Sequence, residues 1–200
     1  MILSQEIEQR YDRIAAWYDS VNFFIPNRWR RKAIVLASGH VLEVGVGTGL
    51  NFPYYTTACS EIYGIDLSKQ MLGKAAGRAP SIKIPIILET MDVQNLQLAE
   101  KSFDSVVATF VFCTVPDPAA GLAECARVLK PGGSLILLEH VGSRHYRLGK
   151  MMQYLNPAAV RFMGDHITRD TAAEVVQAGF TLRLVENLFL DVVKIIVGIK

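Results

Sequence analysis

The sequence predicts an α/β protein with a doubly wound, mostly parallel sheet that carries helices on both faces. One observation is that apolar, β-branched runs alternate with helical segments along the chain, as parallel strands joined by crossover helices do. Another is that runs such as LILLE at 135–139 hold four apolar residues in succession, which is typical of strands buried on both sides. Together these patterns predict a sheet between two helical layers.

Each expected element follows from a local pattern. Five successive strands are expected at 40–44, 61–65, 84–88, 105–108 and 134–138. The helix at 68–79 begins at Ser68, a favourable N-cap, and the helix at 118–129 ends at the stop signal LKPGG. A third helix is predicted at 170–178, and two last strands at 180–185 and 191–199. Two stretches break the alternation, because residues 1–38 are predicted to be helical and residues 141–168 form a long insertion.

Size and composition limit the classes of protein to which the chain can belong. Its 200 residues, 50% of them hydrophobic, suffice for one core and predict a single domain over 1–200. A net charge of +2 is too balanced to indicate a nucleic-acid partner. No apolar run reaches the roughly 20 residues of a membrane span, and in MILSQEIEQRYDR charged residues fall where a signal peptide would have its apolar core. We therefore expect a cytoplasmic location, with the inner membrane surface as an alternative.

The cysteines point to a reducing compartment. There are three of them, Cys59, Cys113 and Cys125, and none belongs to a CxxC pair. This spacing favours reduced thiols over a disulfide framework or a zinc site. No resident metal is predicted, and Cys113 is expected to be a packing residue rather than a nucleophile.

A glycine-rich turn follows the first expected strand. In VLEVGVGTGLNF, residues 41–52, Gly45, Gly47 and Gly49 alternate directly after an apolar run. A strand, a glycine turn and a helix together place backbone N–H groups at the carboxyl edge of a sheet, where ligands bind. The spacing is GxGxG and no Lys follows, so the turn differs from a phosphate-binding loop. Glu43, just before the turn, repels phosphates and tolerates a cation or an ammonium group.

Two aspartates indicate further parts of the ligand. Asp66 ends the second expected strand about twenty residues beyond the first glycine, where a carboxylate accepts hydrogen bonds from both ribose hydroxyls. Asp92, in MDV after the third strand, could accept a bond from an adenine amino group. The predicted ligand therefore has an adenine, a ribose and a cationic amino-acid part. The alternative is that the aspartates are caps or turn residues and that the glycines only permit close packing.

Taken in chain order, EVGVGTGLN, IYGIDLS, MDV, FDSVVATFVFCTV and LKPGG resemble the motifs of class I S-adenosylmethionine-dependent methyltransferases over about residues 38–140. The resemblance implies a seven-stranded sheet whose last strand is antiparallel, and S-adenosylmethionine as the cofactor. It implies that the glycines approach the methionine part, that Asp92 with Val93 flanks the adenine, and that Thr109 and Phe110 lie near the sulfonium. The predicted cofactor-binding residues are Tyr11, Glu43, Gly45, Gly47, Thr48, Gly49, Asn51, Asp66, Leu67, Met71, Asp92, Val93, Thr109 and Phe110.

The N-terminal residues 1–38 are predicted to form a helical lid over the cofactor, and residues 141–168 a substrate-side insertion. Ile7, Tyr11, Ile14 and Tyr18 fall on one helical face. One interpretation places a tyrosine hydroxyl near the reacting atom, and the other places both tyrosines in the core. The segment RYDRIAAWYD resembles the start of ubiquinone-type and phospholipid methyltransferases, which favours the first interpretation.

Aromatic and basic residues gather in both of these segments. The first holds Trp17, Phe23, Phe24 and Trp29 with Arg28, Arg30, Arg31 and Lys32, and the second holds Arg144, His145, Arg147 and Lys150 among Tyr146, Met151 and Met152. Rings at headgroup level beside cations that face anionic lipid suit peripheral contact with an anionic membrane. The alternative is a solvated basic helix face over an ordinary aromatic core.

The stretch EHVGS…LNP…GDHITRDT…AGF, residues 139–180, resembles bacterial phosphatidylethanolamine N-methyltransferases and a related branch that methylates small alkyl thiols. We therefore expect methyl transfer to a lipid or lipophilic acceptor, and the amine nitrogen of phosphatidylethanolamine is the acceptor that we favour. The alternatives are a small thiol, a quinone precursor, or a cofactor-binding module without transfer activity. Because an amine must be neutral to attack, the predicted catalytic residues are Tyr18, His140 and His166, beside Asp165. Asp165 and His166 could instead be an N-cap pair.

Overall fold

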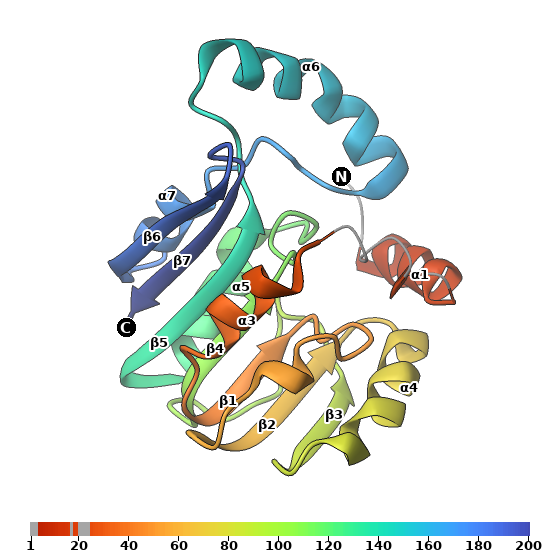
Figure 1. The fold of residues 1–200 in the computed structure, drawn as a ribbon, viewed down its shortest axis with the longest axis vertical. Helices are drawn as coiled ribbons and strands as arrows, with labels where there is room; N and C mark the ends of the chain where they lie inside the picture. The colour runs from red at the N-terminus through yellow and green to blue at the C-terminus, as the bar shows by residue number, and fades with distance from the viewer. Residues whose placement is uncertain (1–3, 17, 20–24) are drawn as a thin grey trace.

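The computed structural model describes residues 4–16, 18–19 and 25–200. Its strands form one seven-stranded sheet in the order β3-β2-β1-β4-β5-β7-β6 (Figure 1). They are β1 (Gly39–Val44), β2 (Cys59–Asp66), β3 (Ile86–Thr90), β4 (Phe103–Thr109), β5 (Leu129–His140), β6 (Thr181–Phe189) and β7 (Val193–Ile199). Strands β1 to β5 are parallel, and β7 is antiparallel to both of its neighbours. The predicted sheet with an antiparallel last strand is confirmed.

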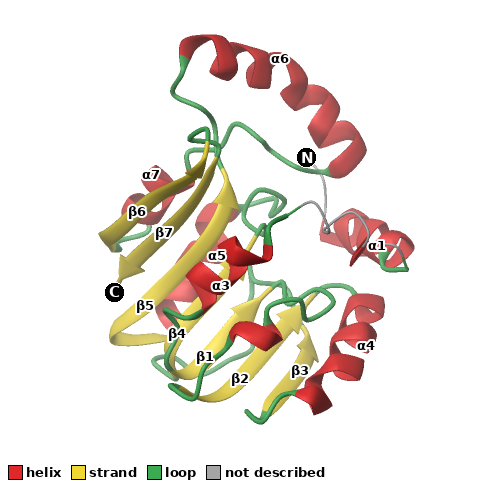
Figure 2. Cartoon of the chain, in the orientation of Figure 1, coloured by secondary structure: helices red, strands yellow, loops and turns green. Residues whose placement is uncertain are grey.

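Helices cover both faces of this sheet (Figure 2). One layer contains α3 (Asn27–Ile34) and α4 (Lys69–Arg78), and the other contains α5 (Pro118–Val128) and α7 (Thr171–Gln177). Along β1, Val41 packs into the core under the first layer with Ile34, and Leu42 packs into the core under the second layer with Leu122. Because successive side chains point to opposite faces and both faces are covered, the strand has no solvent side. This explains its continuous apolar run.

Three of the described helices, α4, α5 and α7, begin at a side-chain cap. Ser68 Oγ accepts a hydrogen bond from the backbone N–H of Met71 at 3.1 Å, at the start of α4. Asp170 caps α7 in the same way, through the backbone N–H of Ala173. The alternative in which Asp165 and His166 cap this helix is therefore wrong. These two residues lie in the segment between α6 and α7, so their side chains do not cap the helix.

Two regions differ from the expected boundaries. The predicted helix end at LKPGG is confirmed to within one residue, because α5 ends at Val128 and Leu129 is its C-cap. The strand that follows begins earlier than expected, at Leu129 rather than at 134, because Leu129 already pairs with Phe103 of β4. The predicted insertion at 141–168 contains a long helix, α6 (Tyr146–Met163), which extends away from the sheet at the top of Figure 1. The N-terminal residues contain α1 (Ser4–Ile14) in addition to α3. None of the described helices is both long and apolar enough to cross a membrane.

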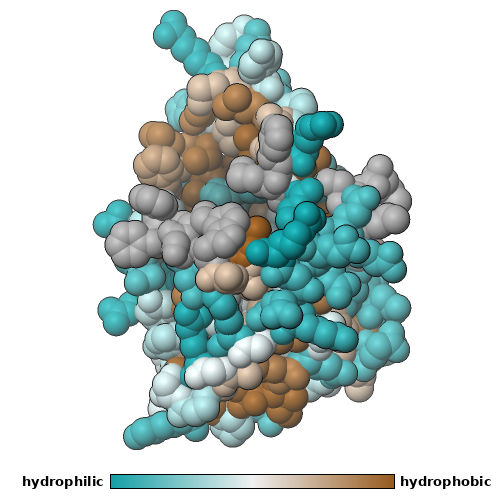
Figure 3. Space-filling view, turned by 90° about the vertical axis from the view of Figure 1, so that its right-hand side faces the viewer, coloured by the Kyte–Doolittle hydropathy of each residue, from teal (hydrophilic) through white to brown (hydrophobic). Residues whose placement is uncertain are grey.

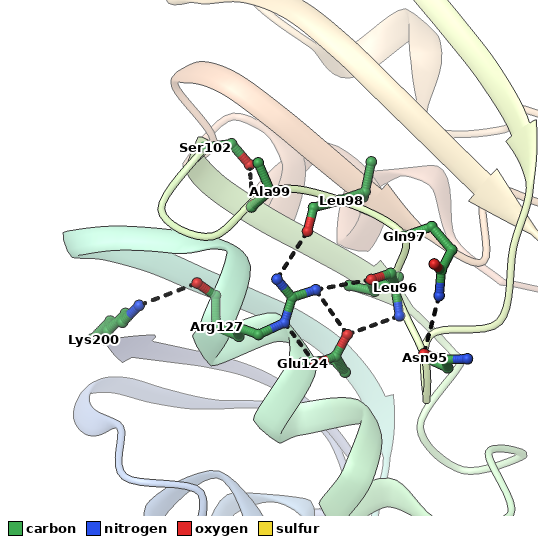
Figure 4. A network of polar contacts seen from close by, with 9 residues as sticks. All are labelled: Asn95, Leu96, Gln97, Leu98, Ala99, Ser102, Glu124, Arg127 and Lys200. Atoms are coloured by element: carbon green, nitrogen blue, oxygen red, sulfur yellow. Dashed lines mark hydrogen bonds and ion pairs between the residues drawn. The ribbon is translucent and has the colours of Figure 1, made fainter.

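An ion pair on α5 fixes the connection from β3 to β4 (Figure 4). Arg127 donates to the carbonyl oxygens of Leu96 and Leu98, both at 2.8 Å, and pairs with Glu124 at 2.7 Å. Glu124 in turn accepts a bond from the backbone N–H of Leu96 at 2.8 Å. These bonds hold the chain that follows Asp92, so they support one end of the site described next.

Candidate active site

The glycine turn after β1 depends on backbone conformations that other residues rarely adopt. Gly45, Gly47 and Gly49 have φ angles of +62°, +56° and +81°. A Cβ at Gly45 would also meet Val111 Cγ2 at 2.5 Å, whereas the nearest side-chain atom to a Cβ at Gly47 is Tyr18 Cε1, at 3.9 Å. Gly47 therefore presents bare backbone to the pocket, and glycine adopts these angles without the steric cost that other residues have.

A pocket lies beside this turn, at the carboxyl edge of the sheet. Its walls come from the ends of β1, β2 and β4, from the residues after β3 and from the N-terminal segment. The predicted residues that line it are Tyr11, Tyr18, Gly45, Gly47, Asp66, Leu67, Asp92, Val93, Thr109 and Phe110.

Other lining residues were not predicted, and some predicted residues lie elsewhere. The additional lining residues are Ile7, Val44, Ile65, Met91, Gln94, Val111, Thr114, Val115 and Pro116. Most of them flank predicted positions, and the last four follow Phe110 in or just after the motif FDSVVATFVFCTV, so a wider window on that motif would have found them. The predicted residues off the pocket wall are Glu43, Thr48, Gly49, Asn51, Met71, His140 and His166. Their contact with the cofactor stays a prediction.

Asp66 is held in place at the pocket wall. Its Oδ2 accepts a hydrogen bond from the backbone N–H of Gly47 at 2.8 Å, and its Oδ1 accepts one from Ser68 at 2.9 Å. Burial raises the pKa of Asp66 to about 6, although these backbone bonds oppose the shift. Each carboxylate oxygen keeps a second lone pair. The group can therefore still accept bonds from ligand hydroxyls, as the predicted ribose contact requires.

Asp92 also stands on the pocket wall. Ser4 Oγ of α1 donates to its Oδ2 at 2.7 Å, and the backbone N–H of Gln94 donates to its Oδ1 at 2.9 Å. The neighbouring side chains of Met91 and Val93 are buried and apolar. An acceptor between apolar groups suits the amino group and the ring of an adenine.

Several bonds tie the N-terminal residues to this edge of the sheet. Ser68 Oγ donates to Asp12 Oδ1 at 2.5 Å, and Asp19 accepts bonds from Thr48 Oγ1 and from Arg78 Nη2, both at 2.6 Å. Tyr11 and Tyr18 both line the pocket, with their ring centroids 6.0 Å apart. This placement agrees with the interpretation in which the tyrosines face the ligand. The aromatic residues Trp17, Phe23 and Phe24 lie outside the described residues.

A buried polar network lies next to the turn. Glu43 is fully buried, and its oxygens accept bonds from Asn51 Nδ2 at 2.7 Å and from the Tyr55 hydroxyl at 2.8 Å. Arg30 donates to Asn51 Oδ1 at 3.1 Å and to Thr109 Oγ1 at 3.0 Å. Burial raises the pKa of Glu43 to about 7, and these bonds and Arg30 oppose the shift. Glu43, which was predicted to tolerate a cationic ligand, is therefore hydrogen-bonded to side chains of the protein itself.

The position of Arg30 corrects one part of the predicted membrane contact. Only 5% of this residue is exposed, and its guanidinium lies 5.7 Å from the ring centroid of Phe110. Lys32 of the same cluster pairs with Glu186. The prediction that Arg30 faces anionic lipid is therefore wrong, because its partners Asn51 and Thr109, distant in sequence, draw it into the core. Arg28 and Arg31 remain exposed.

The loop after β4 forms the wall opposite the glycine turn, and two charged residues hold it. Glu139 of β5 is fully buried, and its Oε1 accepts bonds from the backbone N–H groups of Val111 at 2.9 Å and Phe112 at 3.0 Å. Burial raises the pKa of Glu139 to about 7. Arg169 donates to the carbonyl oxygens of Phe112 and, at 2.8 Å, Val115. Sequence reasoning missed both residues, although both lie within the stretch 139–180.

The predicted catalytic histidines lie behind this loop rather than on the pocket wall. The ring of His140 is 4.7 Å from the ring of Phe110, which lines the pocket. Its Nδ1 is 3.8 Å from Asp165 Oδ2, too far for a direct hydrogen bond. Burial lowers the pKa of His140, and it also lowers that of His166. His166 donates its backbone N–H to the carbonyl oxygen of Cys113 at 2.8 Å.

The pocket chemistry fits a nucleoside that carries a cationic part. Two carboxylates, Asp66 and Asp92, stand on its wall among apolar side chains, and no Lys or Arg appears among the described lining residues. A phosphate group would lack a cation there, whereas a ribose, an adenine and a sulfonium would each find a suitable neighbour. The fold and the pocket thus define a class of α/β nucleoside-binding proteins with the ligand at the carboxyl edge of the sheet.

Comparison with known proteins identifies the family. Residues 42–137 match the family described as "Methyltransferase domain". The demethylmenaquinone methyltransferase of Tropheryma whipplei (strain Twist) is 30% identical over an alignment of 184 positions, which covers 81% of this chain and 76% of that protein. The chain therefore belongs to the S-adenosylmethionine-dependent methyltransferase family, and its cofactor is S-adenosylmethionine, which the residues of the pocket fit.

Two further comparisons concern sequence and fold. The phosphatidylethanolamine N-methyltransferase of Cereibacter sphaeroides is 36% identical over 117 residues, 58% of this chain and 57% of that protein. The chain thus spans about three fifths of the length of the first curated relatives that it matches. A structure from Thermotoga maritima, described as an S-adenosylmethionine-dependent methyltransferase and possible histamine N-methyltransferase, superposes with a TM-score of 0.73 at 22% identity, over 95% of this chain and 98% of that one.

Proposed function

We propose that this protein transfers a methyl group from S-adenosylmethionine to a lipid or a lipophilic small molecule, and that the amine nitrogen of phosphatidylethanolamine is the leading acceptor. The similarity to the phosphatidylethanolamine N-methyltransferase of Cereibacter sphaeroides supports this acceptor. The similarity to the demethylmenaquinone methyltransferase of Tropheryma whipplei supports a quinone precursor as the alternative. The observation that carries the lipid part of the proposal is the outer face of α6.

The outer face of α6 combines apolar and basic side chains. Tyr146, Met151 and Tyr154 are 73%, 53% and 86% exposed. Arg147 and Lys150 are exposed among them, and Lys150 Nζ lies 4.5 Å from the ring centroid of Tyr146. Figure 3 shows hydrophobic residues gathered on the upper part of one side of the molecule, at the height of α6, with hydrophilic residues around them. A helix face of this composition suits the boundary between lipid headgroups and acyl chains.

In this proposal the chain's own residues bind and orient the cofactor. Asp66 accepts bonds from the ribose, Asp92 accepts one from the adenine, and the backbone of the glycine turn borders the methionine part. The bound cofactor supplies an electrophilic methyl group on a positively charged sulfur. Because such a displacement gains most from alignment and from exclusion of water, Tyr11 and Tyr18 of the N-terminal segment act as a lid over the pocket.

An amine acceptor also needs a group that takes its proton. His140 is the candidate that we favour, because burial lowers its pKa and leaves the ring unprotonated at neutral pH. Its ring contacts Phe110, which lines the pocket, so the acceptor would approach along that side. Tyr18 on the pocket wall and His166 behind the loop are proposed to orient the acceptor.

Transfer of labelled methyl groups from S-adenosylmethionine to a panel of phospholipids, thiols and quinols tests the proposal. We expect label in phosphatidylethanolamine and less or none in the other classes. Label only in a thiol or a quinol would overturn the lipid acceptor and favour the alternatives. Binding of S-adenosylhomocysteine without any transfer would favour a cofactor-binding module, and absence of binding in a thermal shift assay would contradict the site itself.

Membrane contact through α6 requires a separate experiment. We expect co-sedimentation with vesicles that contain anionic phospholipid, and a loss of most of the bound fraction in the double variant Arg147→Glu, Lys150→Glu. The matched control is Lys83→Glu, which reverses an exposed charge before β3, at the other end of the molecule. Equal sedimentation of all three proteins would refute contact through this helix, and so would absence of sedimentation for the unmodified protein.

A further inference from the structure

Three side chains that can bind a metal meet beside the pocket. Cys113 lies in the loop after β4, His140 is the last residue of β5, and Asp165 follows the end of α6. One ligand atom from each lies within 4.8 Å of the other two, and His140 Nδ1 is 3.8 Å from Asp165 Oδ2. They are distant in sequence, so only the fold brings them together.

The backbone around this cluster is fixed by hydrogen bonds. The N–H group of His166, next to Asp165, donates to the carbonyl oxygen of Cys113 at 2.8 Å. Arg169 donates to the carbonyl oxygens of Phe112 and Val115 on both sides of Cys113. A cluster whose segments are already joined needs little reorganisation to bind an ion, which favours binding.

Two buried oxygens at this cluster lack a hydrogen-bond partner among the described residues. They are Asp165 Oδ1 and Glu139 Oε2, and Glu139 is fully buried. The Cys113 thiol lies against the carboxyl groups of both residues, but it has a single proton and can satisfy only one of them. An unpaired buried carboxylate oxygen is costly, and a cation bound at the cluster would remove that cost.

We propose that Cys113, His140 and Asp165 bind one Zn²⁺ ion, with Glu139 as a buried carboxylate behind the thiolate. Because a metal-bound imidazole cannot take up a proton, zinc binding here and the action of His140 as the base proposed above exclude one another. A thiolate, an imidazole and a carboxylate form a ligand set that zinc favours, whereas Mg²⁺ and Ca²⁺ favour oxygen ligands alone. Zinc bound through nitrogen and oxygen at about 2.0 Å and sulfur at about 2.3 Å spaces its ligand atoms roughly 3.3–3.6 Å apart. The cluster therefore needs to contract by only about 1 Å.

The site has an access path and an open position. The side chain of His140 is 38% exposed, so an ion can arrive from that side although Cys113 is buried. A bound metal displaces the proton of a thiol, which allows a buried cysteine to act as a ligand. Three protein ligands leave the fourth tetrahedral position free. The ring of His140 contacts Phe110, so an ion there would stiffen the loop that lines the pocket.

Titration of the untagged full chain with Co²⁺, as a spectroscopic substitute for Zn²⁺, tests the proposal. We expect one equivalent to bind, with a thiolate-to-cobalt charge-transfer band and displacement of the cobalt by Zn²⁺. Cys113→Ser should abolish the band and weaken binding more than about tenfold. Cys125→Ser is the matched control, because Cys125 is equally buried but belongs to α5, from which it packs into the core, and it should keep both band and stoichiometry.

Several results would overturn the site. They are absence of the charge-transfer band in the unmodified protein, persistence of the band in Cys113→Ser, or its loss in a correctly folded Cys125→Ser. His140→Ala provides a second variant, and unchanged affinity there would also refute the ligand set. Circular dichroism establishes that each variant is folded, and the titration of the unmodified protein decides the matter even where a variant is not. Because no methyl transfer is needed, failure here is distinct from failure of the proposed function.

Discussion

Replacing Glu43 by Gln is predicted to reduce the dependence of the protein's stability on pH. Glu43 is fully buried, and its pKa in the folded state is raised to about 7 from an ordinary value of 4.5. Gln has the same shape and can keep both contacts, because it can accept from Asn51 and donate to the Tyr55 hydroxyl. The substitution therefore removes a titratable group and leaves the packing of the side chain unchanged.

The sign and size of the effect follow from proton linkage. Because the folded pKa is raised, the folded state binds more protons than the unfolded state between pH 4.5 and about 7. The stability that the protonated carboxyl contributes is complete below pH 4.5 and is lost as pH rises through 7. Integrated from pH 5 to pH 8, the loss in the free energy of unfolding is about 2.5 kcal/mol. Glu139 has a similar folded pKa, titrates in both proteins and cancels in the difference.

Urea denaturation followed by tryptophan fluorescence at pH 5 and pH 8 measures this effect. The difference in unfolding free energy between Glu43→Gln and the unmodified protein should shift by about 2.5 kcal/mol in favour of the variant. A constant offset, such as that from the lost charge beside Arg30, does not contribute to the shift. Glu100→Gln, at an exposed position, should give none. Parallel pH profiles for Glu43→Gln and the unmodified protein would refute the reasoning.

Three further predictions concern the pocket. Gly45→Ala should lower the free energy of unfolding by at least about 1 kcal/mol, because φ is +62° and the new Cβ meets Val111 at 2.5 Å. Gly73→Ala, in α4 with nothing within 4 Å of its Cβ, should raise the free energy of unfolding by about 0.5–1 kcal/mol. Thermal melts that rank the two variants in the opposite order would contradict this. Asp66→Ala should weaken S-adenosylhomocysteine binding at least about tenfold in calorimetry, since it removes a ligand acceptor and a support of the glycine turn, and unchanged affinity would exclude the ribose role. Arg169→Met should weaken the same binding because it frees two carbonyl groups of the loop after β4, and equal affinity would show that the loop needs no such support.

The sheet and the cofactor end of the pocket could be predicted because their determinants are local. The glycine turn and Asp66 each follow directly from a strand, and parallel strands place their carboxyl ends at one edge. The start of β5 was predicted too late, at 134, because a strand pairing, Leu129 with Phe103, extends the strand through the turn residues. Pairing between distant segments leaves no mark in a short window of sequence.

The environment of charged residues could not be predicted in the same way. Arg30 stands in a basic run that resembles a surface, yet its partners Asn51 and Thr109 lie 21 and 79 residues further along the chain. Cys113 and His140 come together for the same reason, since β4 and β5 are neighbours in the sheet. A local sequence pattern predicts local structure, whereas the burial of a charged side chain depends on residues that are distant in sequence and that the fold places around it.

The hydrogen bond between Ser4 and Asp92 couples nucleoside binding in the pocket to the detachment of α1. Ser4 belongs to α1, and Asp92 stands on the pocket wall. A nucleoside that takes over the lone pair used by Ser4 loosens the beginning of α1, and a change that detaches α1 frees an acceptor for the nucleoside. Such coupling is reciprocal. The rate at which spent cofactor leaves would then be set by the motion of the N-terminal helix as well as by the affinity of the pocket.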